Sequence, residues 1–243
     1  MPIAEDTLFS TGTVAEDFAF NDQVADVFDD MLSRSVPYYR TVIDGMAQLL
    51  ACHLAAGATV CDLGCSTGTT LLELARRLPE LQLCYIGIDK APAMLAKARR
   101  KSAMFSKSEV MRFIEADITS CPLPRAEAII CNYTLQFLRP LTRRPFVRRL
   151  YEALPAGGIL FLGEKTISHA SRLNRDFIDI YHKFKKQQGY SELEIAAKRE
   201  ALENVLIPFS QEENIRLLRE AGFEEIEPFF RWFNFTATVA LKR

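Results

Sequence analysis

The chain has 243 residues, of which 49% are apolar and 25% are charged, a balance typical of an ordinary globular protein. This length is enough for one α/β domain with additions, or for two small domains, with a well-buried core. The 30 basic and 31 acidic residues leave a net charge of −1. That balance argues against a dedicated nucleic-acid-binding protein, because such proteins usually have an excess of basic residues.

The sequence also gives no indication of a membrane helix, a signal peptide or a metal site. No apolar run approaches the ~18 residues that a membrane helix needs. The acidic N-terminus lacks the positive start and apolar stretch of a signal peptide, so we expect a cytoplasmic protein. The six cysteines form no C-x-x-C pair, and there are only three histidines. We therefore predict reduced, buried thiols and no bound metal.

The first part of the chain predicts helices and then an alternating α/β pattern. Residues 1–20 have no regular pattern, and residues 21–54 predict two helices, with Pro37 near the start of the second. We then predict strands over residues 59–63, 83–89, 111–117, 126–134 and 158–166, with helices over 69–78, 92–100 and 142–154. Continuously apolar strands separated by helices predict a doubly wound, mostly parallel sheet covered on both faces.

The alternation stops after Thr166. Residues 170–206 predict two consecutive helices, residues 211–221 a third, and the last two strands form an antiparallel hairpin with Arg231 and Trp232 between them. A parallel sheet that ends in such a hairpin is the layout of class I enzymes that use S-adenosylmethionine (SAM). We expect residues 1–56 to be an N-terminal extension with helices. Residues 57–243 are then one SAM-binding Rossmann-like domain, with 170–206 as a helical lid inserted over the carboxyl edge of the sheet.

The stretch "DLGCSTG", residues 62–68, joins the first predicted strand to the following helix. Its glycines allow positive φ and a close approach of the backbone to a ligand. It is not a triphosphate-binding loop, and it lacks the full spacing of a dinucleotide-binding loop. It resembles the first motif of SAM enzymes, which wraps the amino-acid part of SAM. The alternative is a glycine-rich corner without a ligand.

Polar residues follow three further strands. Asp89 ends the second strand, 25 residues after Gly64, where an acid binds a ribose diol; alone it could equally cap the next helix. Asp117 follows the third strand, where SAM enzymes commonly hold the adenine amino group, and Asn132 ends the fourth, near the methionine moiety. Together with the loop they predict a SAM site.

Arg199 stands out in the predicted lid. On a helix, it falls within a narrow arc together with Ile195, Leu202 and Leu206. If that arc faces the protein, the guanidinium is partly buried and requires an anion. The alternatives are that Arg199 reaches solvent or pairs with a structural glutamate.

Several stretches along nearly the whole chain resemble the carboxy-S-adenosyl-L-methionine synthase family: "DTLFS", "RSVPYY", "DLGCSTG", "IDKAPAM", "NYTLQFL", "GYSELEIAAKR" with "LENV", and the terminal "FNF". The resemblance implies an enzyme that converts SAM and prephenate to carboxy-SAM and phenylpyruvate, without a metal. It implies that Arg199 binds the added carboxylate. It further implies that SAM is bound by Tyr39, Gly64, Cys65, Ser66, Asp89, Lys90, Asp117, Ile118, Asn132 and Arg199.

The resemblance also implies partners. It suggests a homodimer whose product passes to a tRNA uridine carboxymethyltransferase, which makes 5-carboxymethoxyuridine at the wobble position. We expect no direct contact with nucleic acid, and we interpret the basic runs at residues 97–101 and 143–149 as solvated helix faces. Two alternatives are an ordinary small-molecule methyltransferase and a SAM-binding regulatory module without chemistry.

Overall fold

The fold is built on one seven-stranded sheet with the order β3-β2-β1-β4-β5-β7-β6. The computed structural model describes residues 5–12 and 18–243. All neighbouring strands are parallel except at β7, which pairs antiparallel with both β5 and β6. The strands are β1 (Thr59–Leu63), β2 (Cys84–Asp89), β3 (Met111–Glu115), β4 (Ala128–Asn132), β5 (Ile159–Lys165), β6 (Glu225–Trp232) and β7 (Phe235–Leu241).

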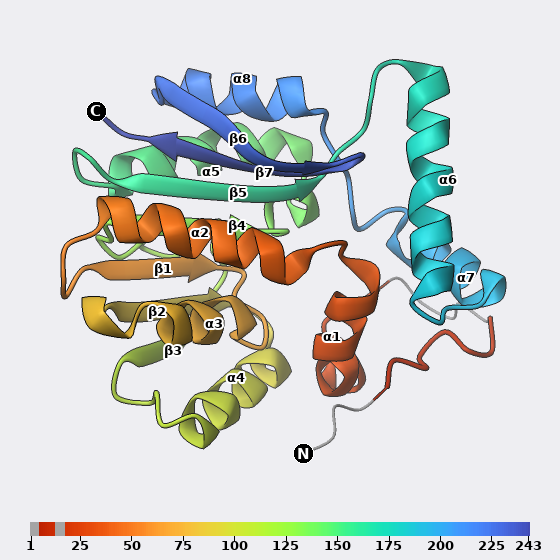
Figure 1. Cartoon of the computed structure of the whole chain (residues 1–243), viewed down its shortest axis with the longest axis horizontal. Coiled ribbons are helices and arrows are strands. Elements are labelled where there is room, and N and C mark those ends of the chain that lie inside the picture. Colours follow the sequence, from red (N-terminus) through yellow and green to blue (C-terminus); the bar gives the residue numbers. More distant parts are fainter. Residues whose placement is uncertain (1–4, 13–17) are drawn as a thin grey trace.

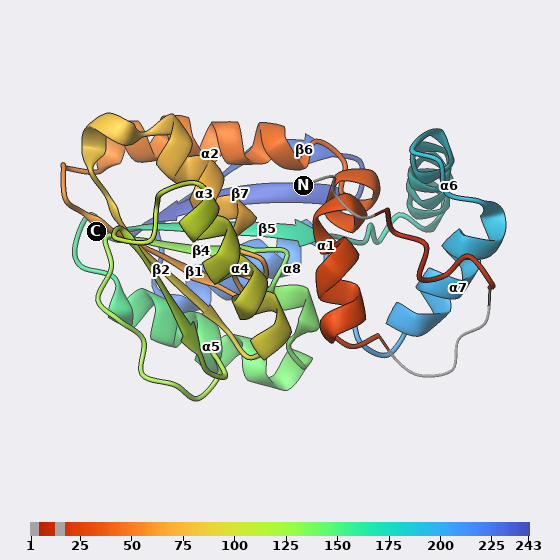
Figure 2. The same cartoon turned by 90° about the horizontal axis from the view of Figure 1, so that it is seen from below.

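Helices cover both faces of this sheet (Figure 2). Neighbouring residues of one strand face opposite layers, so Val60 packs into one core and Cys61 into the other. The first core contains α2 (Tyr39–His53), α3 (Thr69–Arg77) and α4 (Pro92–Met104), and the second contains α5 (Pro140–Ala153) and α8 (Gln211–Ala221). Two short 3-10 helices, Pro79–Leu81 and Leu135–Phe137, complete these layers. The predicted doubly wound fold is confirmed.

Three further helices lie beyond the carboxyl ends of the parallel strands (Figure 1). Helix α1 (Asp22–Ser35) packs through Val24, Phe28 and Met31 against Met94 of α4. Helices α6 (Ser171–Gln187) and α7 (Glu192–Leu202) stand at the same end and connect β5 to α8. They correspond to the predicted insertion. Because ligands of doubly wound folds bind at this edge, these helices surround the expected site.

The last hairpin differs from its prediction. Its turn consists of Phe233 and Asn234, and β6 continues to Trp232, which pairs with Phe235. Phe233 adopts a φ of +46°, a conformation that sequence patterns assign to Gly or Asn. Aromatic packing of Trp232 on Phe184 of α6, with ring centroids 5.5 Å apart, keeps this residue in the strand rather than in the turn.

Four basic residues and two cysteines also depart from expectation. Arg143 is only 1% exposed and donates to the carbonyl oxygen of Leu138, because the start of α5 packs onto carbonyl groups of the preceding loop. Lys101 binds the Asp29 carboxylate at 2.9 Å. Lys97 donates to the carbonyl oxygen of Ala25 at 2.7 Å, and Arg149 donates to that of Ile118 at 3.2 Å. These four side chains are therefore not part of solvated faces. All six thiols are free, but Cys52 and Cys84 are exposed.

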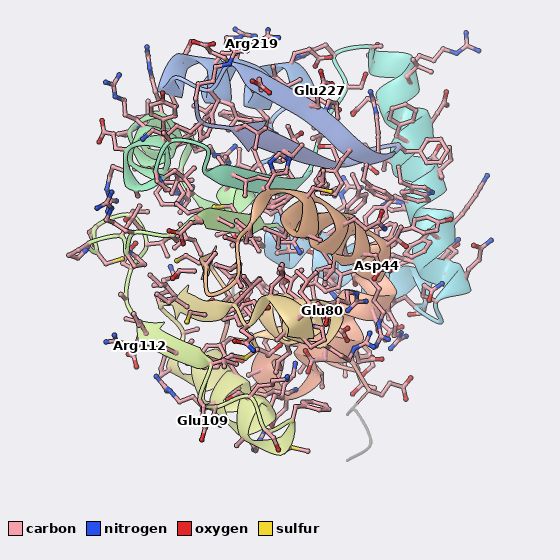
Figure 3. All side chains as sticks on the ribbon, turned by 60° about the vertical axis from the view of Figure 1, so that its left-hand side comes forward. Asp44, Glu80, Glu109, Arg112, Arg219 and Glu227 are labelled. Carbon is pink, nitrogen blue, oxygen red and sulfur yellow. The ribbon has the colours of Figure 1, made fainter. Side chains whose placement is uncertain are left out.

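Exposed charged side chains cover the outside of the layers. Figure 3 labels six of them: Asp44, Glu80, Glu109, Arg112, Arg219 and Glu227. No helix among the described residues is both long and apolar enough to cross a bilayer.

Candidate functional site

A cavity of about 1000 Å³ opens at the carboxyl ends of the parallel strands. The glycine loop after β1 forms one side of it, and α6 and α7 contribute residues to the other. All ten residues predicted to bind the cofactor line this cavity: Tyr39, Gly64, Cys65, Ser66, Asp89, Lys90, Asp117, Ile118, Asn132 and Arg199. Residues that are up to 160 positions apart in the chain thus meet around one space.

The glycine loop is held by backbone hydrogen bonds. The amides of Gly64 and Cys65 donate to the carbonyl oxygen of Ile88 at 2.8 and 3.1 Å, and the Ser66 amide donates to Asp89 Oδ2 at 2.8 Å. Gly64 has a φ of +76°, and a Cβ there would lie 2.5 Å from the Thr134 side chain. Glycine is therefore required at this position, both for its conformation and for the close packing.

Asp89 joins the loop to the next helix. Its second oxygen accepts the amide of Ala91 at 2.9 Å, directly before α4. Burial raises the pKa of this carboxyl group, and the two backbone hydrogen bonds oppose the shift. The capping alternative and the ribose prediction are thus compatible, because each carboxylate oxygen retains a lone pair for a ligand.

Asp117 and Ile118 form a different part of the wall. Asp117 is exposed, and its carboxylate accepts hydrogen bonds from the backbone and hydroxyl of Thr119 at 2.8 and 2.6 Å. These bonds lower its pKa, which keeps it ionised. Ile118 is 8% exposed and supplies an apolar surface beside it.

Tyr39 and Asn132 meet at Thr70. The Tyr39 and Thr70 hydroxyls lie 2.9 Å apart, and Asn132 Nδ2 donates weakly to the same Thr70 oxygen at 3.4 Å. Asn132 Oδ1 is buried and has no partner among the described residues. A buried acceptor without a donor is unfavourable, so this oxygen can accept a hydrogen bond from a bound ligand.

Asp62 is a site residue to which the sequence analysis assigned no role. It is 2% exposed and lines the cavity, and its carboxylate makes no hydrogen bond within the described part of the chain. Burial, and secondarily the nearby Asp89, raise its pKa to about 8. Its position in the "DLG" motif was the available signal, but its lack of a partner depends on the tertiary structure. A cationic ligand would stabilise its ionised form.

The opposite wall is basic. Lys165 from β5, His182 and Lys185 from α6, and Arg199 from α7 all line the cavity. Only Arg199 of these four is predicted from the sequence, because no motif marks Lys165, His182 or Lys185. The cavity is thus polarised, with carboxylates at the ends of β1 and β2 and cations toward the lid. No three His, Cys, Asp or Glu side chains of the described residues group in a way that could hold a metal ion.

Of the alternatives for Arg199, burial within an apolar stripe does not hold, and the side chain reaches solvent. The buried residues of α7 are Ile195, Ala197, Lys198 and Ala201, and Arg199 is exposed at the cavity. The helix also ends at Leu202. Lys198 takes the buried position because Asp6 supplies a carboxylate for it at 3.2 Å, a partner that helical periodicity cannot reveal. Arg199 itself has no ion pair or hydrogen bond within the described residues.

Comparisons with known proteins identify the family of this chain. Residues 60–158 match the family described as "Methyltransferase domain". The carboxy-S-adenosyl-L-methionine synthase of Desulfotalea psychrophila is 57% identical to this chain, covering 98% of it and 97% of the relative. The one from Nautilia profundicola is 45% identical over 98% of this chain and 100% of the relative.

Solved structures agree on the fold. Human N-acetylserotonin methyltransferase in complex with SAM superposes with a TM-score of 0.64 at 18% identity, covering 99% of this chain and 63% of that protein. This likeness concerns the fold alone. Together with identities of 45–57% across almost the full length of both chains, it leads to one conclusion: this chain is an enzyme of the carboxy-S-adenosyl-L-methionine synthase family, built on the α/β fold of SAM-dependent methyltransferases.

Proposed function

We propose that this enzyme converts SAM and prephenate to carboxy-SAM and phenylpyruvate. The proposed balance is simple: prephenate loses CO2 and hydroxide as its ring becomes aromatic, and the CO2 joins the methyl carbon of SAM. The proton lost from that carbon and the departing hydroxide form water. Carboxy-SAM then serves a tRNA uridine carboxymethyltransferase that makes 5-carboxymethoxyuridine at the wobble position. We further propose a cytoplasmic homodimer that does not itself bind tRNA.

The observation that carries this proposal is Arg199, an unpaired cation in the same cavity as the glycine loop. A guanidinium can bind a carboxylate through two parallel hydrogen bonds. Transfer of a neutral methyl group would need no such partner. The polarity of the cavity supports the same conclusion, because SAM carries a sulfonium cation and prephenate carries two carboxylates.

The acidic side of the cavity fits the remaining parts of SAM. Asp89 has acceptor capacity for the ribose hydroxyls, and Asp117 with Ile118 offers a polar and an apolar contact for adenine. Buried Asp62 and the Asn132 oxygen can accept from the ammonium of the methionine part. Exclusion of water by the lid helices during the reaction would protect CO2 and a reactive carbon from side reactions.

Incubation with SAM and prephenate, followed by mass spectrometry of both products, tests the proposal. Carboxy-SAM and phenylpyruvate should appear in equal amounts. Methyl transfer to an acceptor without carboxy-SAM would instead identify an ordinary methyltransferase. Tight SAM binding with neither reaction would identify a regulatory module.

SAM binding should depend on pH through Asp62. The pKa of this group, about 8 in the free protein, means that it is largely protonated at neutral pH and must lose a proton to pair with a cation. SAM affinity should therefore rise with pH up to about pH 8, by at most about tenfold per unit, and then level off. Calorimetry in buffers of different ionisation enthalpy would detect the proton release. Asp62→Asn should flatten the slope; an unchanged slope in this variant would contradict the prediction.

A further inference from the structure

Two lysines on the basic side of the cavity lack an anion. Lys185 of α6 is only 6% exposed, and Lys165 at the end of β5 is half-buried. Both line the cavity, and neither ammonium makes an ion pair or hydrogen bond within the described residues. Their contact is the Tyr181 ring, whose centroid lies 5.0 Å from Lys165 Nζ and 4.7 Å from Lys185 Nζ.

Two other lysines in the described part of the chain that are shielded from solvent do have a carboxylate partner. The other buried lysine of the lid, Lys198, has Asp6 at 3.2 Å and the Ser35 hydroxyl at 3.0 Å. Behind the glycine loop, Lys101 has Asp29 at 2.9 Å. Since a buried charge without a counter-charge is unfavourable, Lys165 and Lys185 are expected to bind an anion from outside the chain. Burial, and then the charges of Lys165, Lys198 and Arg199, lower the pKa of Lys185 to about 7.

Nearby carboxylates of the protein do not serve this purpose. Glu164 precedes Lys165, but it accepts the amide of Leu135 at 3.0 Å and is 2% exposed. A second orphan group lies in the same wall: the Tyr133 hydroxyl is buried and has no partner among the described residues. The ring of Phe235 connects the two tyrosines, at 6.1 Å from Tyr133 and 4.9 Å from Tyr181. Aromatic rings thus lie beside the two lysines in the same wall of the cavity.

We propose that Lys165, Lys185 and the Tyr133 hydroxyl form a carboxylate subsite for the part of the acid substrate that survives the reaction, at a position separate from Arg199. This inference rests on the proposed function. Prephenate carries one carboxylate that leaves as CO2 and one that remains in phenylpyruvate. Cations on the leaving carboxylate would stabilise the reactant charge that the reaction must disperse, and would slow it. The lysine pair therefore suits the retained carboxylate, while Arg199 binds the carboxylate that forms on SAM.

Phenylpyruvate contains only the retained carboxylate. Its binding therefore tests the lysine subsite independently of the carboxylate position at Arg199. We would titrate it by calorimetry into enzyme saturated with SAM. Lys185→Met and Lys165→Met should each weaken phenylpyruvate binding and raise the KM for prephenate by about ten- to a hundredfold, with SAM affinity unchanged. Lys185→Arg should restore part of the loss. Arg199→Leu should change phenylpyruvate affinity far less than either lysine variant, because Arg199 acts on the two lysines only through its charge.

Two controls distinguish binding from structural effects. Lys183→Met changes an exposed residue of α6 that does not line the cavity, and should change nothing. The free Lys185→Met protein should unfold at the same or a higher temperature than the original, because a buried unpaired cation has been removed; a marked fall would indicate a structural lysine.

Unchanged phenylpyruvate affinity in both methionine variants would overturn the subsite, as would an equal loss of SAM and phenylpyruvate binding. If the original enzyme binds phenylpyruvate through these lysines but forms no carboxy-SAM, the proposed function fails and the anion subsite stands. If it forms carboxy-SAM but the lysine variants keep their KM for prephenate, only the subsite fails.

Discussion

Replacement of Arg199 by leucine should lower the yield of carboxy-SAM by about ten- to a hundredfold, the effect of removing a charge-assisted hydrogen-bond donor. SAM affinity and thermal stability should stay the same, because Arg199 is exposed and makes no ion pair or hydrogen bond within the described residues. Calorimetric titration with carboxy-SAM and with SAM measures the two affinities separately. The loss should appear only for the carboxylated ligand.

Two further variants sharpen this result. Arg199→Lys keeps the charge but not the planar pair of donors, and should recover only part of the affinity for carboxy-SAM. Arg219→Leu removes an exposed arginine from α8 outside the cavity (Figure 3) and serves as the matched control. Equal affinities for carboxy-SAM in the Arg199→Leu and original enzymes would remove the proposed role of this residue.

Replacement of Asp6 by alanine should destabilise the lid by about 3–5 kcal/mol, the cost of leaving one partner of a buried ion pair alone. Asp6 is 2% exposed and accepts hydrogen bonds from Lys198 Nζ at 3.2 Å and from the Tyr190 hydroxyl at 2.5 Å. Its loss would leave the Lys198 ammonium buried beside the cations of the cavity. Urea unfolding and hydrogen exchange of α7 would measure the global and the local effect.

A double-mutant cycle tests whether the two charges act as a pair. Asp6→Ala combined with Lys198→Met should be less destabilising than Asp6→Ala alone, because no buried charge is then left without its partner. Additive losses would contradict the coupling. Since Arg199 follows Lys198 directly, release of α7 should also raise the Kd for carboxy-SAM in the Asp6 variant and restore it in the double variant.

The sequence predicted the elements of the fold closely because their signals are local. The strand at residues 59–63 and the helix at 211–221 have the observed bounds. Apolar periodicity indicates where such elements form, and a glycine loop can be identified from its composition. The hairpin turn was misplaced by two residues because packing of Trp232 on α6, not local turn chemistry, decides where β6 ends.

The candidate site also contains residues that could be predicted from the sequence and residues that could not. The polar residues that follow the strands could be identified because the carboxyl ends of parallel strands meet at one edge. The buried face of α7 could not, because two arcs of this helix have similar apolar content. Contact with Asp6, 192 residues away in the chain from Lys198, decides between them.

The sequence by itself determined the α/β order, the glycine loop and the residues that gather around it. Only the tertiary structure decided which charged groups have partners. Asp62 is left without a cation, and Lys165, Lys185 and Arg199 without an anion, among the described residues. The physical reason is that a charge's environment depends on groups brought near it from anywhere in the chain, whereas helix and strand patterns depend on neighbours in sequence.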